Sequence, residues 1–311
     1  MSALKRAFVF PGQGSQKVGM LSELSENYPI IGETFSQASE VLGYDLWALS
    51  QNGPQEELNL TEITQPLLLT ASVAIWRLWL QKEGVKPELL AGHSLGEFSA
   101  LVAAGVISFE EGVALVRNRG AYMQTAVPVG VGGMAAIIGL ADDAIEAACK
   151  VSEEGECVVP VNYNSPGQVV IAGHTAAVER AMTACKEAGA KRALPLPVSA
   201  PFHTPLMEPA GVKLAEDINA LTFNAPEIPI VHNVHAKTES DPEVIKSLMI
   251  KQIAAPVLWT SSMEAMRDAG VEAVIECGVG NVASGLARRV HKGFTAATTD
   301  SLAALDKALA L

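Results

Sequence analysis

Short and long apolar runs alternate along the first part of the chain. Residues 7–10 are all apolar and lead into a Pro-Gly turn, which predicts a buried strand. A long apolar stretch at 67–81 predicts a helix, with Thr64 as its N-terminal cap. A second short run at 89–91 predicts another strand, and the small residues at 99–104 predict a helix behind it. This alternation of strands and helices indicates an α/β fold.

A glycine-rich break at 128–133 is followed by a different pattern. This pattern predicts strand 134–139, helix 142–151, strand 157–163, strand 168–172, helix 175–188 and strand 192–198. The order β-α-β-β-α-β is typical of a ferredoxin-like fold. We expect this segment to end at 199–201, where the chain returns to the α/β part.

Strands and helices alternate again in the rest of the chain. Strands are expected at 228–233 and 274–277, and helices at 259–269 and 281–290. The pattern therefore predicts a large α/β domain made of residues 1–128 and 201–311. A small ferredoxin-like domain is expected to be inserted into it at residues 129–200.

The sequence Gly92-His93-Ser94-Leu95-Gly96 lies between the predicted strand at 89–91 and the helix behind it. In a strand–turn–helix context, Gly-x-Ser-x-Gly is the pattern of a nucleophile elbow, whose sharp turn presents the serine hydroxyl. The start of the helix offers unpaired N–H groups and a positive dipole end to an oxyanion. A glycine-rich turn that holds a serine by chance is the alternative, and the flanking elements favour the elbow.

A serine hydroxyl becomes a good nucleophile only when a base takes its proton, and the chain has six histidines. His93 adjoins Ser94, but neighbouring side chains in an elbow point away from each other. His203 is favoured because two prolines flank its loop, which lies where the insertion returns to the large domain. A loop histidine without a catalytic task remains the alternative on these grounds.

A catalytic triad would also need an acid to orient the histidine. The acidic residues between Ser94 and His203 are not expected at a strand end, where an esterase would place one. Patatin-type lipases pair the serine with an aspartate that comes late in the sequence, and Asp268 has such a position. We interpret Asp268 as the end of a helix instead. We therefore expect a backbone carbonyl or an amide side chain to orient His203.

Composition narrows the function classes. The 311 residues carry a formal net charge of −12, which disfavours general nucleic-acid binding. Charged residues interrupt the apolar runs before the ~20 residues that a membrane span needs, and Pro11 comes too early for an export signal's apolar core. The cysteines show no metal-ligand spacing and predict reduced thiols in a cytoplasmic protein: Cys149, Cys157, Cys185 and Cys277.

Seven motifs occur in order along nearly the whole chain. They are residues 8–16, 64–66, 92–97, 119–120, 123–124, 162–168 and 202–203. Together they resemble the malonyl-CoA:acyl carrier protein transacylases of type II fatty acid synthesis, and they are similar to the acyltransferase domains of polyketide synthases. The resemblance implies an α/β-hydrolase-like large domain with a ferredoxin-like inserted subdomain, in agreement with the apolar pattern.

The resemblance also implies a catalytic role for each matching residue. Ser94 matches the family's nucleophile and His203 its base. Gln13 and the backbone N–H of Leu95 match the oxyanion hole. Gln252 falls where the family uses a backbone carbonyl, rather than an acid, to hold the histidine. No metal or bound redox cofactor is implied.

Further residues match the substrate-binding part of the family. Arg119 matches the arginine that binds the malonyl carboxylate, and a planar guanidinium suits a carboxylate because it binds both oxygens. The residues expected to line the substrate pocket or contact CoA are Phe202, Met123, Asn162, Asn164, Gln168 and Arg192. In having a phenylalanine directly before the histidine, the chain resembles the malonyl-selective polyketide acyltransferases.

The function implied is transfer of malonyl from malonyl-CoA to the phosphopantetheine thiol of acyl carrier protein, for fatty acid synthesis. A discrete polyketide acyltransferase, an acyl-thioester hydrolase and a carrier-protein docking protein without catalysis are the alternatives. Carrier proteins of this family are acidic, so docking needs a local basic patch. The candidates, which could also be ordinary solvated charges, are Lys191 with Arg192, and Arg288 with Arg289 and Lys292.

Overall fold

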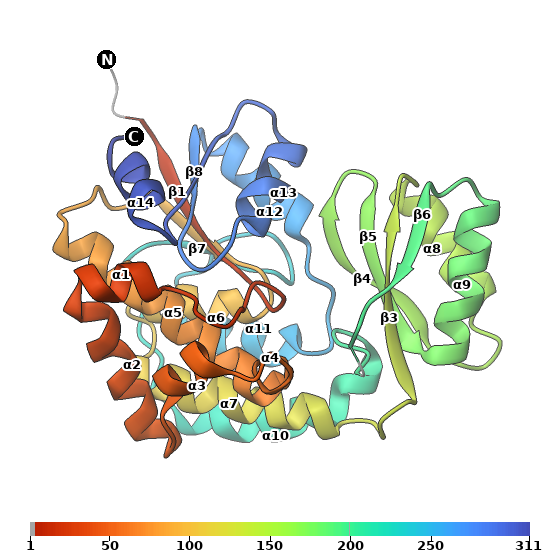
Figure 1. Cartoon of the computed structure of the whole chain (residues 1–311). Helices are drawn as coiled ribbons and strands as arrows, with labels where there is room; N and C mark the ends of the chain where they lie inside the picture. Colours follow the sequence, from red (N-terminus) through yellow and green to blue (C-terminus); the bar gives the residue numbers. More distant parts are fainter. Residues whose placement is uncertain (1–3, 199) are drawn as a thin grey trace.

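The computed structural model describes residues 4–198 and 200–311. Residues 1–3 and Ser199 lie outside this description; they include the start considered for an export signal and part of the expected end of the insertion. The chain forms a larger part around a five-stranded sheet and a smaller part around a four-stranded sheet, which lie side by side (Figure 1).

The five-stranded sheet of the larger part is parallel throughout and has the strand order β7-β2-β1-β8-β9. Its strands are β1 (Arg6–Phe10), β2 (Leu89–Gly92), β7 (Ile230–Val231), β8 (Ala273–Glu276) and β9 (Thr295–Thr298). β7 is shorter than the sequence predicts. β9 lacks an apolar run because it is a partly exposed edge strand, so the sequence pattern did not reveal it.

Helices cover both faces of this sheet. They are α1 (Ser22–Asn27), α2 (Pro29–Leu42), α3 (Leu46–Asn52), α4 (Gln55–Leu58), α5 (Thr61–Gln81), α6 (Leu95–Ala103), α7 (Phe109–Thr125), α10 (Glu208–Ala220), α11 (Pro242–Gln252), α12 (Trp259–Asp268), α13 (Val282–Val290) and α14 (Leu302–Leu309), with a short 3₁₀ helix at Pro205–Met207. Phe8 and Phe10 of β1 pack with α5 and α6, whereas Ala7 and Val9 pack on the opposite face with α12 and α13. The alternation along one strand thus serves two apolar cores.

Helix α5 begins earlier than the sequence predicts. It starts at Thr61 with Leu60 as N-cap, so the expectation that Thr64 caps it is wrong. The Thr64 hydroxyl instead donates to the carbonyls of Leu58 and Leu60, and Pro66 lies inside the helix. By length and composition alone α5 is long and apolar enough to cross a membrane, but 83% of its most apolar window is buried inside the fold. It is the central core helix of the larger part.

The smaller part has the order of elements that the sequence predicts. They are β3 (Gly132–Ile138), α8 (Asp142–Val151), β4 (Val158–Ser165), β5 (Gln168–His174), α9 (Thr175–Glu187) and β6 (Arg192–Pro195). The strands form an antiparallel sheet in the order β4-β5-β3-β6, with both helices packed on a separate apolar cluster. This is the ferredoxin-like arrangement, and the expected α/β fold class is confirmed. β6 ends three residues earlier than expected.

The turn between β2 and α6 depends on two glycines at close approaches. A Cβ on Gly92 would lie 1.9 Å from the carbonyl carbon of Gly96, and a Cβ on Gly96 would lie 2.2 Å from the Phe10 oxygen. Because backbone atoms occupy both places, larger residues cannot be accommodated by side-chain movement. The Gly-x-Ser-x-Gly spacing is thus required by packing between β1, β2 and α6.

We predict that Gly92→Ala destabilises the protein by about 3 kcal/mol or more, because the new methyl overlaps fixed backbone. Thermal or denaturant unfolding measures the change. Gly285→Ala is the matched control, since Gly285 lies inside α13 and, apart from its chain neighbours and the backbone of its own helix, no heavy atom lies within 4 Å of the added Cβ. This control should be neutral or up to about 1 kcal/mol more stable. Equal stability of the two variants would contradict the packing argument.

Candidate active site

Ser94 sits at the turn between β2 and α6 in an unusual backbone conformation. Its φ is 52° and its ψ is −106°, a region that non-glycine residues rarely occupy and that costs about 1–3 kcal/mol. Asn233 holds the turn from both sides: its side chain accepts from the Ser94 N–H at 2.8 Å and donates to the Gly92 carbonyl at 2.7 Å. The strained turn places the serine hydroxyl at the carboxyl end of the sheet.

His203 contacts this hydroxyl directly. The Ser94 Oγ lies 2.7 Å from His203 Nε2, and His203 Nδ1 lies 2.9 Å from the Gln252 carbonyl and 3.1 Å from the Ala255 carbonyl. Because carbonyl oxygens only accept, Nδ1 carries the proton and Nε2 has a free lone pair. The Ser94 hydroxyl therefore donates to a histidine that is ready to act as a base.

Burial keeps His203 neutral. It lowers the pKa of the imidazole to about 3, and the nearby positive charge of Arg119 acts in the same direction. The two carbonyl contacts raise the pKa, but by less. A base with this pKa stays unprotonated throughout the physiological pH range.

Arg119 reaches the same place from α7 and is fully buried. Its Nη2 donates to Ser94 Oγ at 3.1 Å and to Gln252 Oε1 at 2.9 Å, while Nη1 donates to Gln65 Oε1 at 2.7 Å. Burial lowers the pKa of the guanidinium to about 10, so it remains charged at neutral pH. A buried cation whose hydrogen-bond partners are neutral amides keeps its positive charge unpaired next to the nucleophile, and such a charge can attract an anionic group.

Two adjoining cavities lead to Ser94. The inner cavity has a volume of about 140 Å³ and is lined by Gln13, His93, Ser94, Met134, Asn162, Leu196, Val198, Phe202 and His203. The outer cavity has a volume of about 270 Å³ and shares Gln13, His93, Asn162 and Leu196 with the inner one. Asn164 and Gln168 line the outer cavity as well. Residues from both parts of the chain therefore form one path to the serine.

The two residues expected to form the oxyanion hole lie near the nucleophile: Leu95 follows it in the chain, and Gln13 lines the inner cavity with it. Leu95 is the first residue of α6, where a backbone N–H has no partner within the helix. Gln13 lines both cavities, and its Oε1 accepts a 2.7 Å hydrogen bond from the Thr61 hydroxyl. That bond leaves the NH₂ group as the donating end of the Gln13 side chain.

Two of the expected substrate-pocket residues lie elsewhere. Met123 is buried behind the site, where its sulfur is 3.6 Å from Gln65 Nε2, and it is not among the described residues that line the cavities. Arg192 is exposed at the start of β6 and does not line them either. His93 is turned away from the nucleophile, with Nε2 2.7 Å from Asn164 Oδ1. Asp268 is the last residue of α12 and pairs with Arg267 at the surface.

Sequence reasoning missed several residues that shape the site. Gln65, to which the sequence pattern assigned no role, accepts a hydrogen bond from Arg119. Glu97 directly follows the Gly-x-Ser-x-Gly sequence and is fully buried, and the sequence pattern gave it no role. Asn233 carried no sequence signal beyond its place after a strand, since its contacts join segments about 140 positions apart.

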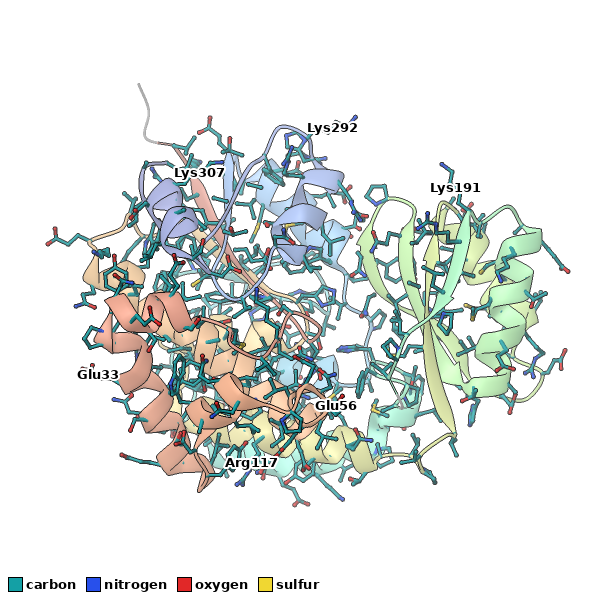
Figure 2. The ribbon with its side chains drawn as sticks, in the orientation of Figure 1. Glu33, Glu56, Arg117, Lys191, Lys292 and Lys307 are labelled. Carbon is teal, nitrogen blue, oxygen red and sulfur yellow. The ribbon has the colours of Figure 1, made fainter. Side chains whose placement is uncertain are left out.

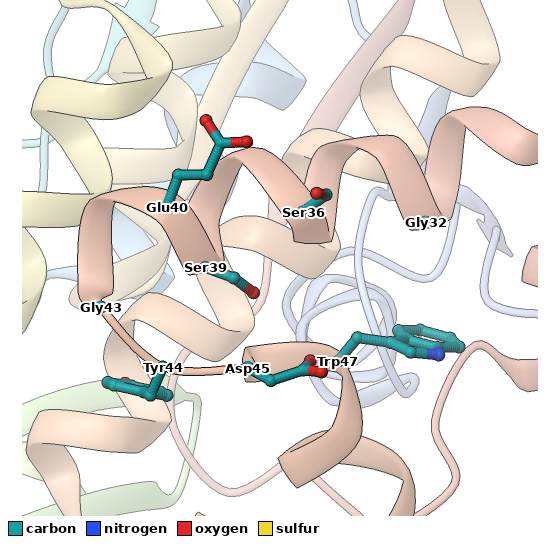
Figure 3. Close-up of a pocket in the computed structure, with 8 residues that line it drawn as sticks. All are labelled: Gly32, Ser36, Ser39, Glu40, Gly43, Tyr44, Asp45 and Trp47. Atoms are coloured by element: carbon teal, nitrogen blue, oxygen red, sulfur yellow. The ribbon is translucent and has the colours of Figure 1, made fainter.

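A larger surface pocket lies away from this site. It has a volume of about 550 Å³ and is formed by α2, the loop that follows it and the first turn of α3 (Figure 3). Its lining residues are Gly32, Ser36, Ser39, Glu40, Gly43, Tyr44, Asp45 and Trp47. These residues include no histidine that could activate a serine, so we place no chemistry there.

The comparisons with known proteins identify the family of this chain. The acyl transferase domain family matches residues 7–301, and the chain belongs to that family. It is 59% identical to the malonyl CoA-acyl carrier protein transacylase of Salmonella typhimurium over 303 residues, 97% of this chain and 98% of the relative. It is 57% identical to the Escherichia coli K12 protein of the same name, over 98% of this chain and 99% of the relative. The resemblance expected from the motifs is confirmed.

Solved structures give the same result. An acyl carrier protein S-malonyltransferase from Vibrio cholerae superposes with a TM-score of 0.96 at 57% identity, covering 97% of this chain and 99% of that chain. A malonyl-transacylase in complex with its type II polyketide synthase acyl-carrier protein has a TM-score of 0.97 at 53% identity, covering 98% and 99%. The fold is therefore shared along its whole length.

We predict that acyl loading is insensitive to mild acid. A histidine with a pKa of about 3 stays neutral as the pH falls, so kcat/KM for loading should be level from about pH 8 to about pH 5. A histidine of ordinary pKa, about 6.5, would lose roughly thirtyfold over the same range. Stopped-flow loading from malonyl-pantetheine, which lacks the phosphates of CoA, measures this, with circular dichroism as the folding control. A fall with an apparent pKa near ~6.5 would contradict the neutral-base assignment.

Proposed function

We propose that the protein transfers malonyl groups from malonyl-CoA to the phosphopantetheine thiol of an acyl carrier protein, and that it supplies fatty acid synthesis. The observation that carries this is the nucleophile Ser94 in contact with both a neutral base, His203, and a buried guanidinium, Arg119. A thioester with a carboxylate at its far end matches this pair of groups. The names of the relatives above describe the same reaction.

In the first half-reaction, His203 Nε2 takes the proton of Ser94 as Oγ attacks the thioester carbonyl. The negative charge that develops on the carbonyl oxygen is stabilised by the Leu95 N–H and by Gln13, and one such donor contributes about 3–4 kcal/mol. When the tetrahedral intermediate collapses, the bond to sulfur breaks and His203 returns the proton to the leaving CoA thiol. The product is a malonyl ester of Ser94.

The second half-reaction reverses these steps with a different thiol. His203 Nε2 takes the proton of the carrier's phosphopantetheine thiol, and the thiolate attacks the malonyl ester. The same oxyanion donors stabilise the second intermediate. Ser94 then leaves and regains its proton from His203, so the enzyme is restored. The path formed by the two cavities serves both thiols in turn.

Specificity for malonyl follows from the burial of Arg119. A malonyl carboxylate pairs with the guanidinium, whereas an acetyl group leaves a desolvated cation unpaired. Phe202 narrows the inner cavity beside the nucleophile and so favours a short acyl group. The selectivity is therefore set by one charge and by the size of the cavity.

The carrier protein is proposed to dock on the basic residues around the opening between the two parts. Lys191 and Lys292 both project at the upper edge of the molecule in Figure 2, one on each part. Arg192 is exposed next to Lys191, and Arg289 reaches across from α13 to donate to Gln168 of β5. Positive groups on both parts suit an acidic carrier.

Two further assignments accompany this function. We assign residues 129–200 as the inserted subdomain and 1–128 with 201–311 as the catalytic domain, supported by the separate sheet and core of the smaller part. We also propose that the protein acts in the cytoplasm, since its four cysteines are free thiols.

We predict that malonyl-CoA adds one malonyl group to the enzyme and that Arg119→Ala reverses its preference. Intact-protein mass spectrometry after malonyl-CoA or acetyl-CoA measures this. Removing the guanidinium should lower malonyl kcat/KM by about a hundredfold or more, while acetyl loading is kept or increased. Ser94→Ala is the control and should gain no mass. A variant that still strongly prefers malonyl-CoA would show that Arg119 does not bind the carboxylate.

We predict that reversing Lys191 and Arg192 to Glu raises KM for the carrier protein severalfold, because attraction to an acidic partner is lost. Serine loading from malonyl-CoA should stay near normal. Transfer by the wild type should weaken with added salt, since exposed charges are screened beyond about 10 Å at 0.1 M ionic strength.

The matched control for these reversals is Lys86→Glu, an exposed lysine before β2 at the opposite end of the sheet. It should leave both steps unchanged. If the Lys191 and Arg192 reversals slow loading from malonyl-CoA as much as carrier transfer, the patch binds CoA phosphates instead of the carrier.

A further inference from the structure

Glu97 is a fully buried carboxylate in the first turn of α6, three residues after the nucleophile. Three donors meet it. Gln252 Nε2 donates to Oε2 at 2.7 Å, His232 Nδ1 donates to Oε1 at 2.7 Å, and the Asn233 N–H lies 3.3 Å from Oε1 and 3.4 Å from Oε2. Burying a charge is unfavourable, and none of the reaction steps described above uses the Glu97 carboxylate.

The contact with Gln252 fixes how the Gln252 amide is turned. Its Nε2 donates both to Glu97 and to the Ser94 carbonyl, at 2.7 and 2.8 Å. Both partners only accept, so the NH₂ end must face them and Oε1 must face the other way. On that side Oε1 accepts from Arg119 Nη2 at 2.9 Å. The carboxylate, together with the Ser94 carbonyl, thus ensures that Arg119 meets an acceptor and not a competing donor.

The amide also keeps the carboxylate and the guanidinium apart. Among the described residues, no acidic side chain forms an ion pair with Arg119. Glu97 therefore supplies a negative charge close to the buried cation without occupying the donors that a substrate carboxylate needs. Arg119 Nε has no partner of its own, which leaves donor capacity on the guanidinium.

We infer that Glu97 is a positioning and specificity-determining residue for malonyl transfer. It acts through Gln252: it orients the amide that aims Arg119, and its charge compensates the guanidinium while the site is empty. This inference rests on the proposed function, in which Arg119 binds the malonyl carboxylate. It adds a residue that contacts neither the acyl group nor the base.

The test is Glu97→Gln, which keeps the size of the side chain but gives it an NH₂ group. The variant removes the negative charge; His232 Nδ1 can accept from the new NH₂ after a change of tautomer, and the Gln252 amide then has a neutral acceptor where it had a charged one. We expect the ratio of malonyl to acetyl kcat/KM for loading to fall about tenfold or more, as when one charge-assisted hydrogen bond is lost. Acetyl loading should change little.

A double-mutant cycle separates positioning from a general structural defect. If Glu97 acts through Arg119, then Glu97→Gln should not lower the ratio further once Arg119 has been replaced by Ala. Gln252→Met removes the amide and should lower the ratio in the same way as Glu97→Gln. Gln252→Met also decides the question should Glu97→Gln fail to fold.

Glu276→Gln is the matched control. Glu276 is equally buried at the end of β8, but it accepts from the backbone N–H groups of Ala283 and Ser284 at the start of α13, away from Arg119. It should lower the melting temperature without changing the malonyl-to-acetyl ratio.

Two results would overturn the inference. One is an unchanged ratio in a folded Glu97→Gln variant, or in Gln252→Met. The other is an equal fall in the ratio with and without Arg119. If Arg119→Ala itself leaves the ratio unchanged, the proposed carboxylate site is wrong; if only the Glu97 variant leaves it unchanged, the site stands and the role of Glu97 is rejected.

Discussion

The burial of one guanidinium beside the nucleophile is the constraint on which the rest of this site depends. A desolvated cation is unfavourable unless it is hydrogen-bonded, yet a direct ion pair would occupy the guanidinium donors that we propose bind the malonyl carboxylate. Here two amide oxygens, from Gln65 and Gln252, accept from Arg119. The two amide oxygens accept hydrogen bonds from some of the guanidinium N–H groups and fix its orientation. Because the amides are neutral, the positive charge stays available to a substrate.

The same constraint explains why the base is held by carbonyls. A carboxylate next to His203 would lie close to Arg119, and it would compete with the carboxylate of the substrate. The carbonyls of Gln252 and Ala255 orient the ring and fix its tautomer without adding charge. Burial and the positive neighbour keep the imidazole neutral, so the histidine is a base before substrate arrives.

The scaffold brings these groups together from distant elements. The nucleophile lies between β2 and α6, the guanidinium comes from α7, and the residue that contacts both Arg119 and His203 is the last of α11. Close packing of Gly92 and Gly96 against neighbouring backbone fixes the turn from which the serine projects. The smaller part contributes the other wall of the path, including Asn162 and Leu196. The larger part thus carries the serine, the histidine and the guanidinium, and the four-stranded sheet lines the path that leads to them.

The sequence by itself determined the features that depend on local pattern. Alternating apolar runs indicated the α/β fold and the ferredoxin-like order of elements, and the Gly-x-Ser-x-Gly spacing indicated a strained turn around Ser94, because close packing and backbone geometry are local requirements. It misplaced the start of α5 and missed β9, since tertiary burial moved the helix start to Thr61 and an edge strand needs no apolar run.

Only the tertiary structure decided which polar groups meet. Glu97 reads as an ordinary helix residue until Asn233 and Gln252, more than a hundred positions away, fold against it. Hydrogen bonds between distant segments leave no periodic signal in the chain, so the network around Arg119 is visible only in three dimensions.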